Sequence, residues 1–302
     1  KDSNLPLEIG RRAKSTVSNL QYYFKGYLQD LRISKKAVYT ACFSKPSSMF
    51  EIAEAIPANE PSCGEVALNI QSNTTTESDA ITDISVNAHA ITKHGDVKHS
   101  SAESILGESA LYFDGNGDYL QIEDNSLRNL HNGETDFTIE CWVNISEWQV
   151  DSSGQQRAHI LGTGGSTAQI GIWLVAINLM DHGFVFRVTK GSAGNAVVSM
   201  SSRTSVNLNT WYHLAVSYDS DTYKFFVDGV LVSESAGNHS HSSGNAFGPF
   251  RVGRFSWSGD SISHTAYYKG YLQDLRISNK AVYTGCFVPP ASLHANLVTT
   301  PT

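Results

Sequence analysis

Apolar and polar residues alternate along most of the chain after residue 64, with the period of two that is typical of β-strands. In the stretch FTIECWV (137–143), the odd-numbered positions carry Phe, Ile, Cys and Val. The alternation places these apolar side chains on one face of a strand and the remaining three on the other. The same pattern predicts strands at Ser109–Phe113, Tyr119–Ile122, Phe137–Val143, Ile170–Ile177, Gly183–Thr189, Ala196–Ser199, Tyr212–Tyr218, Tyr223–Asp228 and Phe250–Gly253.

Turn-forming residues separate these predicted strands. Asp228-Gly229 and the run DGNG (114–117) supply residues that readily adopt the positive φ angles of tight hairpins. No segment has the three-and-four spacing of apolar residues that indicates an amphipathic helix. The pattern therefore excludes a parallel α/β sheet and predicts an all-β protein, with two antiparallel sheets packed as a sandwich.

Two segments of the chain have almost the same sequence. Residues 25–43 match residues 269–287 except at Lys35/Asn279 and Ala41/Gly285, and the similarity extends over residues 5–43 and 248–287. The interval between the copies is that of a whole domain, because solenoid units run to roughly 20–50 residues. We therefore interpret residues 1–43 as the C-terminal strands of a preceding domain, 44–63 as a linker, 64–290 as one complete domain, and 291–302 as a linker or the start of a next segment.

The partial copy at residues 1–43 is expected to need a partner. A two-stranded piece is at best marginally stable alone in water. Residues 1–43 are therefore predicted to bind another copy of the chain or a neighbouring repeat by adding a strand to an exposed sheet edge. The chain also begins with Lys1, so we expect it to be a piece of a longer tandem array.

Composition limits the classes of partner. The formal net charge is −7 and only 17% of residues are charged, without a cluster of Lys and Arg, so nucleic acid is not an expected partner. No apolar run approaches the roughly 18 residues of a membrane span, and no signal peptide is present, so no membrane is expected either. The abundance of Ser, Thr, Asn and Gly is typical of secreted or virion β proteins.

Six segments carry a resemblance to a known family: ALYFDGNGDYLQI (110–122), DFTIECWV (136–143), NTWYHLAVSYD (209–219), YKFFVDGVLV (223–232), PFRVGR (249–254) and GYLQDLRISNKAVYTGCFVPP (270–290). In this order they resemble the laminin G-like, concanavalin A-like jelly-roll family over about residues 64–290. The last segment is most similar to versions in tail-fibre and other virion proteins of tailed phages. The resemblance implies a jelly roll, a fold that serves lectins, adhesion modules, spacers and some glycosidases.

The carboxylates do not form a hydrolytic pattern. Glycoside hydrolysis needs two carboxylates close together, and the concanavalin-like glucanases place Glu, Asp and Glu at alternating positions of one strand. Here Glu140 stands alone between Thr138 and Trp142. We therefore expect the protein not to be an enzyme.

The run from Asp114 to Asp118 has oxygen-bearing side chains at every second residue, as a calcium-binding loop begins. Tyr119 and Asn125 stand where an EF-hand loop would have Gly and Glu, so a hairpin turn is the other interpretation. Many laminin G-like domains bind calcium at a rim. The resemblance thus implies Asp114 and Asp118 as candidate ligands of a structural Ca²⁺ ion.

Sugar binding by such modules needs exposed aromatic rings beside groups that bind hydroxyls. Trp257 is the first candidate, in the polar loop FSWSGDS (255–261), with Asp260 and Tyr267 nearby in sequence. Trp148 is the second candidate. The partial copy has no tryptophan in the matching loop, so the two loops differ where the strands do not, as expected if loops carry specificity. Three further tryptophans lie in strand patterns and are expected to pack in the sandwich: Trp142, Trp173 and Trp211.

The chain has four cysteines. Cys141 lies on the apolar face of its strand and is predicted to be a buried free thiol. Cys63 precedes the first strand of the complete domain and Cys286 follows the last, so a Cys63–Cys286 disulfide is predicted if those ends are neighbours. Cys42–Cys63 is the competing pairing, and unpaired thiols are the third interpretation.

Two opposite charges occur in the last strand. By alternation, Asp274 and Arg276 lie on the same face as Leu272, while Leu275 and Ile277 lie on the other. We predict that the charges form an ion pair with a neighbouring strand.

Taken together, the sequence predicts a non-enzymatic structural or adhesion module of a repetitive virion or extracellular fibre, with surface glycans as a candidate ligand. The first alternative is a purely structural assembly protein without a ligand. The second is a glycan-degrading enzyme or an accessory domain of one.

Overall fold

The computed structural model divides the chain into two units, Lys1–Glu54 and Ala55–Thr302, and every described residue lies in the second unit. The partial repeat at residues 1–43 therefore lies outside the described residues. These residues are 59–74, 78–128, 130, 135–151, 154–163, 171–179, 182–190, 195–237, 248–255 and 266–294.

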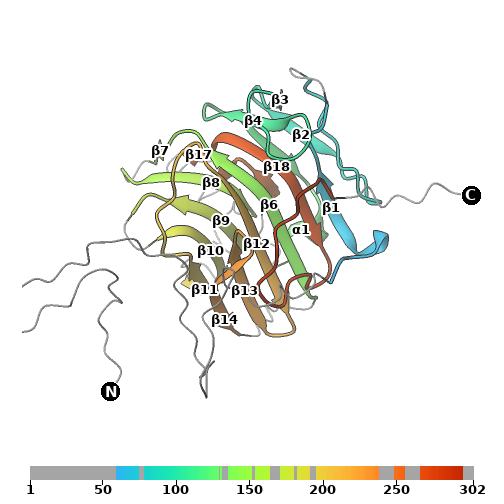
Figure 1. The fold of residues 1–302 in the computed structure, drawn as a ribbon, viewed down its shortest axis with the longest axis vertical. Helices are drawn as coiled ribbons and strands as arrows, with labels where there is room; N and C mark the ends of the chain where they lie inside the picture. The colour runs from blue at the N-terminus through green and yellow to red at the C-terminus, as the bar shows by residue number, and fades with distance from the viewer. Residues whose placement is uncertain are drawn as a thin grey trace, which may run out of the picture. The chain divides into compact units, whose positions relative to one another are not determined.

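The second unit contains two antiparallel sheets that face each other (Figure 1), as the alternating pattern predicts. In the first sheet β1 pairs with one side of β18, and the remaining strands follow one path. Their order is β14 (Val230–Ala236), β13 (Thr222–Val227), β12 (Trp211–Asp219), β6 (Phe137–Ile145), β18 (Lys269–Ser278), β4 (Ala110–Asp114) and β3 (Lys98–Ser100), with β1 at Val66–Ile70.

The second sheet packs against the first, and a short two-stranded ribbon, β16–β17, leaves it at one end. The order of the sheet is β11 (Asn195–Ser201), β10 (Gly183–Lys190), β9 (Gly171–Ile177), β8 (Gln156–Gly162), β15 (Phe250–Val252), β5 (Tyr119–Ile122) and β2 (Ile91–His94), with β7 (Gln149–Val150) on β8. The ribbon is β16 (Arg254–Phe255) and β17 (Ala266–Tyr267).

The helices among the described residues are the 3-10 turn η1 (Cys63–Glu65) and the four-residue α1 (Asn125–Arg128). Neither is long and apolar enough to cross a membrane.

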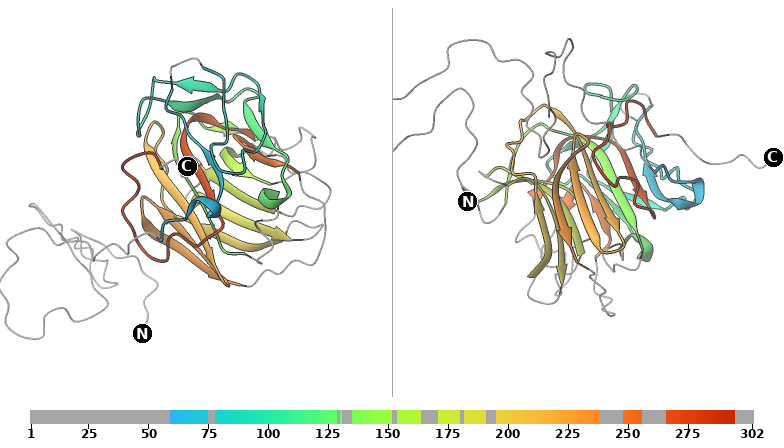
Figure 2. Two further views of the ribbon diagram at one scale, coloured as in Figure 1. Left: turned by 90° about the vertical axis from the view of Figure 1, so that its right-hand side faces the viewer. Right: turned by 60° about the horizontal axis from the view of Figure 1, so that its bottom comes forward.

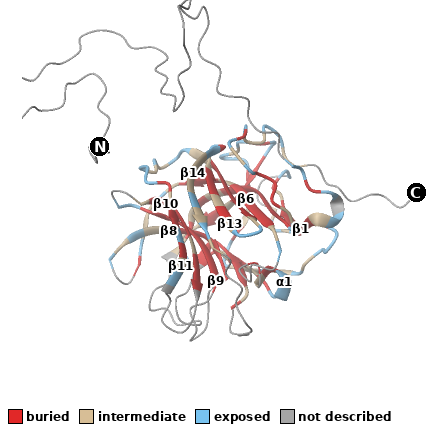
Figure 3. Cartoon of the chain, turned by 90° about the horizontal axis from the view of Figure 1, so that it is seen from below, coloured by how far each residue is buried: buried red, intermediate tan, exposed pale blue. Residues whose placement is uncertain are grey.

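The core lies between the two sheets, where the inward side chains of both are buried (Figure 3). On β6 the odd-numbered residues point into it, as the alternation predicts, and Cys141 among them is a fully buried free thiol. Each large apolar side chain buried in this way contributes about 1.5–3 kcal/mol to folding. Because both sheets supply such residues, the jelly-roll sandwich is held mainly by this one apolar layer.

The last strand, β18, does not keep the predicted alternation. Asp274 has a φ angle of 56°, and the register shifts between Gln273 and Arg276. This bulge adds a residue, so Leu272 lies in the core together with Leu275 and Ile277, and the prediction that Leu272 shares a face with Asp274 and Arg276 is wrong. At the bulge the neighbour of β18 changes from β4 to β1.

After β18, residues 279–294 cross the outer face of the first sheet. We call this segment the C-terminal strap; it is dark red in Figures 1 and 2. Val282, Tyr283 and Phe287 of the strap form a second apolar cluster with Ala215 and Phe226 of the sheet. Contacts extend beyond the predicted domain limits, because the Asn59 N–H donates to the carbonyl of Val282 at 2.9 Å.

Candidate functional site

An aromatic cluster lies where the β16–β17 ribbon meets β2 and β5. The His94 ring stacks on Tyr119 with centroids 4.1 Å apart and planes 4° from parallel. This pairing follows from the antiparallel register, which places His94 opposite Tyr119. Tyr267 of the ribbon lies 6.4 Å from Tyr119, centroid to centroid. Both tyrosines are partly exposed.

The guanidinium of Arg254 lies close to both tyrosine rings. Its guanidinium carbon is 4.8 Å from the centroid of Tyr119 and 5.7 Å from that of Tyr267, within the range of cation–π attraction. The β16–β17 register sets this geometry, because Arg254 pairs with Tyr267. We call His94, Tyr119, Arg254 and Tyr267 the arginine–tyrosine cluster.

Of the four predicted sugar-binding residues, the structure places one in this cluster. Tyr267 belongs to the cluster. Trp148 is partly buried and packs against the core, which leaves less of its ring for a ligand. Trp257 and Asp260 lie outside the described residues, in the segment that connects β16 to β17. Trp173 is buried as predicted, whereas Trp142 and Trp211 are only partly buried.

The candidate calcium ligands act as turn residues in the structure. Asp118 is 1% exposed and accepts hydrogen bonds from the backbone N–H groups of Asp96 at 2.5 Å and Asp114 at 2.8 Å. Asp114 accepts one from the Asn116 N–H at 2.6 Å. Burial raises the pKa of Asp118 despite these bonds. Within the described part of the chain no group of three or more His, Cys, Asp or Glu is placed to hold a metal ion, and calcium binding here stays a prediction.

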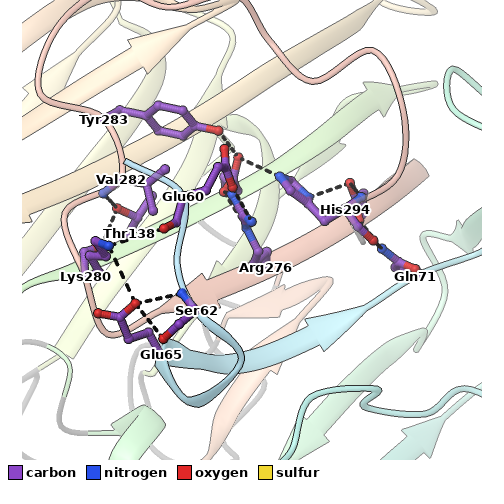
Figure 4. A network of polar contacts seen from close by, with 12 residues as sticks. Glu60, Ser62, Glu65, Gln71, Thr138, Arg276, Lys280, Val282, Tyr283 and His294 are labelled. Carbon is purple, nitrogen blue, oxygen red and sulfur yellow. Dashed lines mark hydrogen bonds and ion pairs between the residues drawn. The ribbon is translucent and has the colours of Figure 1, made fainter. Parts of the chain in front are cut away.

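A polar network that includes Arg276, Tyr283 and His294 lies beneath the strap (Figure 4). Its members surround the buried carboxylate of Glu140 on the first sheet. The Arg276 Nε–H donates to Oε1 of Glu140 at 2.8 Å, and the Tyr283 hydroxyl donates to Oε2 at 2.7 Å. His213 Nε2 lies 3.3 Å from Oε2. The Arg276 guanidinium also binds Glu60, whose Oε2 lies 2.9 Å from Nη1. The predicted ion pair of Arg276 with a neighbouring strand is thereby confirmed.

His294, near the end of the strap, joins this network to the bulge in β18. Its Nδ1 lies 2.6 Å from Asp274 Oδ2 and its Nε2 lies 3.6 Å from Glu140 Oε2. Gln71 donates to the other oxygen of Asp274 at 2.9 Å and to the carbonyl of His294 at 2.6 Å. Asp274 therefore binds the strap and the residue after β1, and not a neighbouring strand as predicted.

The network keeps Glu140 ionised. Burial alone would raise its pKa, but His294, His213 and Arg276 together hold the pKa of the carboxyl below its ordinary value. Burial would likewise lower the pKa of His294, but Glu140 and Asp274 raise it above the usual value for histidine. A carboxylate that stays ionised and is bound on both oxygens can hold the strap against the sheet. Its lowered pKa makes it a poor general acid.

Sequence reasoning missed most of this network. The signals that could have indicated it were a charged residue at the centre of an apolar strand, Glu140, and a single Arg276 on the last strand. His213, Tyr283 and His294 are distant in sequence and carry no motif.

Cys286 is exposed and is a free cysteine. The structure thus does not form the predicted disulfide between Cys286 and Cys63. The reason lies in the strap, which carries the chain away from the end of β18 over the sheet before Cys286 is reached. Cys42 lies outside the described residues.

The two antiparallel sheets, with the core between them and the last strand at the centre of one, define a lectin-like jelly roll. A family model described as the concanavalin A-like lectin/glucanases superfamily matches residues 114–284. The chain belongs to this family, in agreement with the resemblance seen in the sequence. No curated protein matches the chain.

Solved structures with the same fold include binding domains of toxins. The binding domain of botulinum neurotoxin serotype D has a TM-score of 0.50 and 12% identity, over 73% of this chain and 49% of that one. The binding domain of Paraclostridial Mosquitocidal Protein 1 has a TM-score of 0.50 and 14% identity, over 72% and 50%. A structure of botulinum neurotoxin type C has a TM-score of 0.50 and 16% identity, over 72% of this chain and 49% of that one. The chain spans about half the length of these domains, and at these identities the likeness shows the fold alone.

Proposed function

We propose that the chain is a non-enzymatic glycan-binding module of a virion or extracellular fibre. The observation that carries this proposal is the arginine–tyrosine cluster, where two partly exposed tyrosine rings stand at the base of the β16–β17 ribbon. Aromatic rings held rigidly beside polar groups suit the stacking of sugar rings, because their ordering costs little conformational entropy. The sequence indicates Trp257 and Asp260 for the same role. Both residues belong to the segment that connects β16 to β17.

The fold and the buried network support the same proposal. Family members are lectins and glucanases, and the type C neurotoxin with this fold is described as depending on two ganglioside molecules for cell entry. Glu140, the carboxylate on the strand where a glucanase would need several, is buried and bound on both oxygens. A binding role fits these features better than hydrolysis.

A glycan array tests the proposal. We expect the chain to bind a defined group of glycans, and Tyr267→Ala and Trp257→Ala each to weaken binding by at least about tenfold, since loss of one stacked aromatic removes roughly 1–3 kcal/mol. Tyr271→Ala, on the first sheet, removes a partly exposed tyrosine elsewhere and is the matched control.

Two results of the array would contradict the proposal. Binding to no glycan would favour the structural assembly protein without a ligand. Release of saccharide from a bound glycan would favour a glycan-degrading enzyme, and would also require carboxylates other than Glu140.

We propose further that residues 1–43 bind a second copy of the chain or a neighbouring repeat. The support is chemical, because the partial repeat carries the same side chains that fasten β18 and the strap in the complete domain. Four of them are Arg32, Val38, Tyr39 and Phe43, at the positions of Arg276, Val282, Tyr283 and Phe287.

A further inference from the structure

Arg254 is a buried cation for which the described part of the chain offers no acidic partner. Its residue is 6% exposed, and its Nε is a buried nitrogen without a hydrogen-bond partner. Among the residues that the structure describes, no Asp or Glu oxygen is recorded within 4.0 Å of its guanidinium. A buried arginine normally has such a partner, because an unpaired buried charge is costly.

Three acidic residues near the cluster bind other groups. Asp118, next to Tyr119 in sequence, directs both carboxylate oxygens to backbone N–H groups. On the strands beside the cluster, Lys93 pairs with Asp79 at 2.9 Å and Lys269 with Glu147 at 2.6 Å. These three acids are thus engaged elsewhere, and the contacts of the Arg254 guanidinium recorded among the described residues are with the two tyrosine rings.

The rings fix the orientation of the guanidinium. His94 stacks in parallel on Tyr119 at 4.1 Å and so covers one face of that ring. The other face is therefore available to Arg254, which lies 4.8 Å from the Tyr119 centroid and 5.7 Å from the Tyr267 centroid. The guanidinium thus has at least one N–H donor, at Nε, without a hydrogen-bond partner, and an oxyanion that accepts from Nε and a neighbouring nitrogen would satisfy it.

We propose that Arg254 is the recognition centre for an acidic sugar, with its guanidinium binding a carboxylate or sulfate group and Tyr267 contacting the sugar ring. The inference rests on the proposed glycan-binding function and names the class of glycan. The ligand chemistry is an oxyanion attached to a pyranose ring, which a uronic acid, a sialic acid or a sulfated sugar provides. The protein's net charge of −7 works against nonspecific attraction of such ligands, so binding depends on this local site.

Matched pairs of ligands test the inference. The probes are oligogalacturonate and its methyl ester, sialyllactose and lactose, and a sulfated disaccharide with its unsulfated form. We expect the acidic member of at least one pair to bind the wild-type chain at least about tenfold more tightly, because hydrogen bonds to charged groups are worth roughly a factor of ten or more. Raising the salt concentration is expected to reduce that preference. Which pair responds identifies the source of the oxyanion.

Two substitutions assign the effect to Arg254. Arg254→Gln is expected to abolish the preference for the acidic member, and Arg254→Lys to retain only part of that preference, because an ammonium lacks the planar fork. Arg203→Gln removes the same charge from an exposed residue after β11 and is the control. Thermal unfolding of each variant verifies that it is folded.

The outcomes separate this inference from the proposed function. Equal binding of acidic and neutral members, or a preference that survives Arg254→Gln in a folded variant, overturns the role of Arg254. If neutral sugars still bind and Tyr267→Ala still removes that binding, the proposed glycan-binding function stands without a role for Arg254. Binding of neither member overturns both.

Discussion

Glu140 shows how a single carboxylate is kept ionised inside the protein. It is 1% exposed, and Arg276, Tyr283, His213 and His294 surround its two oxygens. Removing one partner of a buried ion pair of this kind generally costs about 3–5 kcal/mol, because the other charge stays buried and unpaired. The network therefore specifies where the strap lies, since Tyr283 and His294 belong to the strap.

His294 is expected to make stability fall at alkaline pH. Its folded-state pKa is raised, so its contribution is fully present below the unfolded pKa of about 6.5 and is lost as pH rises through the folded pKa, with a slope of at most about 1.4 kcal/mol per pH unit. His294→Gln is expected to flatten this alkaline limb. Urea unfolding at a series of pH values measures it, and an unchanged limb in the variant would contradict the assignment.

His159 is expected to act in the opposite sense. Burial lowers its pKa to about 3, so the folded state keeps the ring neutral while the unfolded state takes up a proton below about pH 6.5. Stability is then lost as pH falls from about 6.5 towards 3. His159→Gln is expected to flatten the acid limb in that window and to leave the alkaline limb unchanged, and the same unfolding series distinguishes the two histidines.

At the scale of elements, alternation predicted the strands that keep a strict period. The strands containing Phe137–Val143 and Tyr212–Tyr218 occur where expected. β8 was not predicted, because Gln156, Arg157 and His159 interrupt its apolar pattern. The bulge at Asp274 could not be read from the sequence either, since an inserted residue changes the face of every residue before it without altering composition.

The strap was also missed, and the reason is physical. It has no regular secondary structure over most of its length, so periodicity gives no signal for it. Its position depends on tertiary contacts, including the hydrogen bond from the Phe287 N–H to the carbonyl of Gly229 at 2.9 Å. Gly229, with a φ of 75°, is in the Asp228-Gly229 turn that was predicted, and a Cβ atom there would collide with the Phe287 carbonyl.

Phe287→Ala is expected to loosen the strap. Phe287 stacks on Tyr283 with centroids 3.6 Å apart and is 6% exposed, so its truncation is expected to cost about 3 kcal/mol. Hydrogen exchange is expected to accelerate first at the Val282 and Phe287 amides. Val288→Ala, at a residue 77% exposed, is the control, and equal exchange in the two variants would show that the strap is not held by this cluster.

At the scale of the whole molecule, the fold could be predicted but the candidate site only in part. The two-sheet jelly roll follows from many short alternating strands and from the order of six segments. The arginine–tyrosine cluster depends on β2, β5 and the ribbon meeting at one place, so only Tyr267 of its members was indicated in advance. In the sequence Arg254 belongs to the fold motif PFRVGR, and no pattern there indicates which cations have acidic partners.

The repeated segment gives a prediction for assembly. In the complete domain its counterpart β18 is a strand of the first sheet, and β14 ends the path of that sheet on one side. We expect residues 25–43 of one chain to add to this edge of another, since an unpaired edge offers free backbone donors and acceptors.

Leu28→Pro tests this arrangement, because proline removes a backbone donor in the middle of the repeated strand. We expect light scattering during size-exclusion chromatography to show the wild-type chain self-associating as its concentration rises, and the variant remaining monomeric. Ser48→Pro, in a segment that already contains three prolines between residues 44 and 62, is the matched control. A wild-type chain that stays monomeric throughout, or a Leu28→Pro variant that still associates, would show that the partial repeat does not bind a second copy in this way.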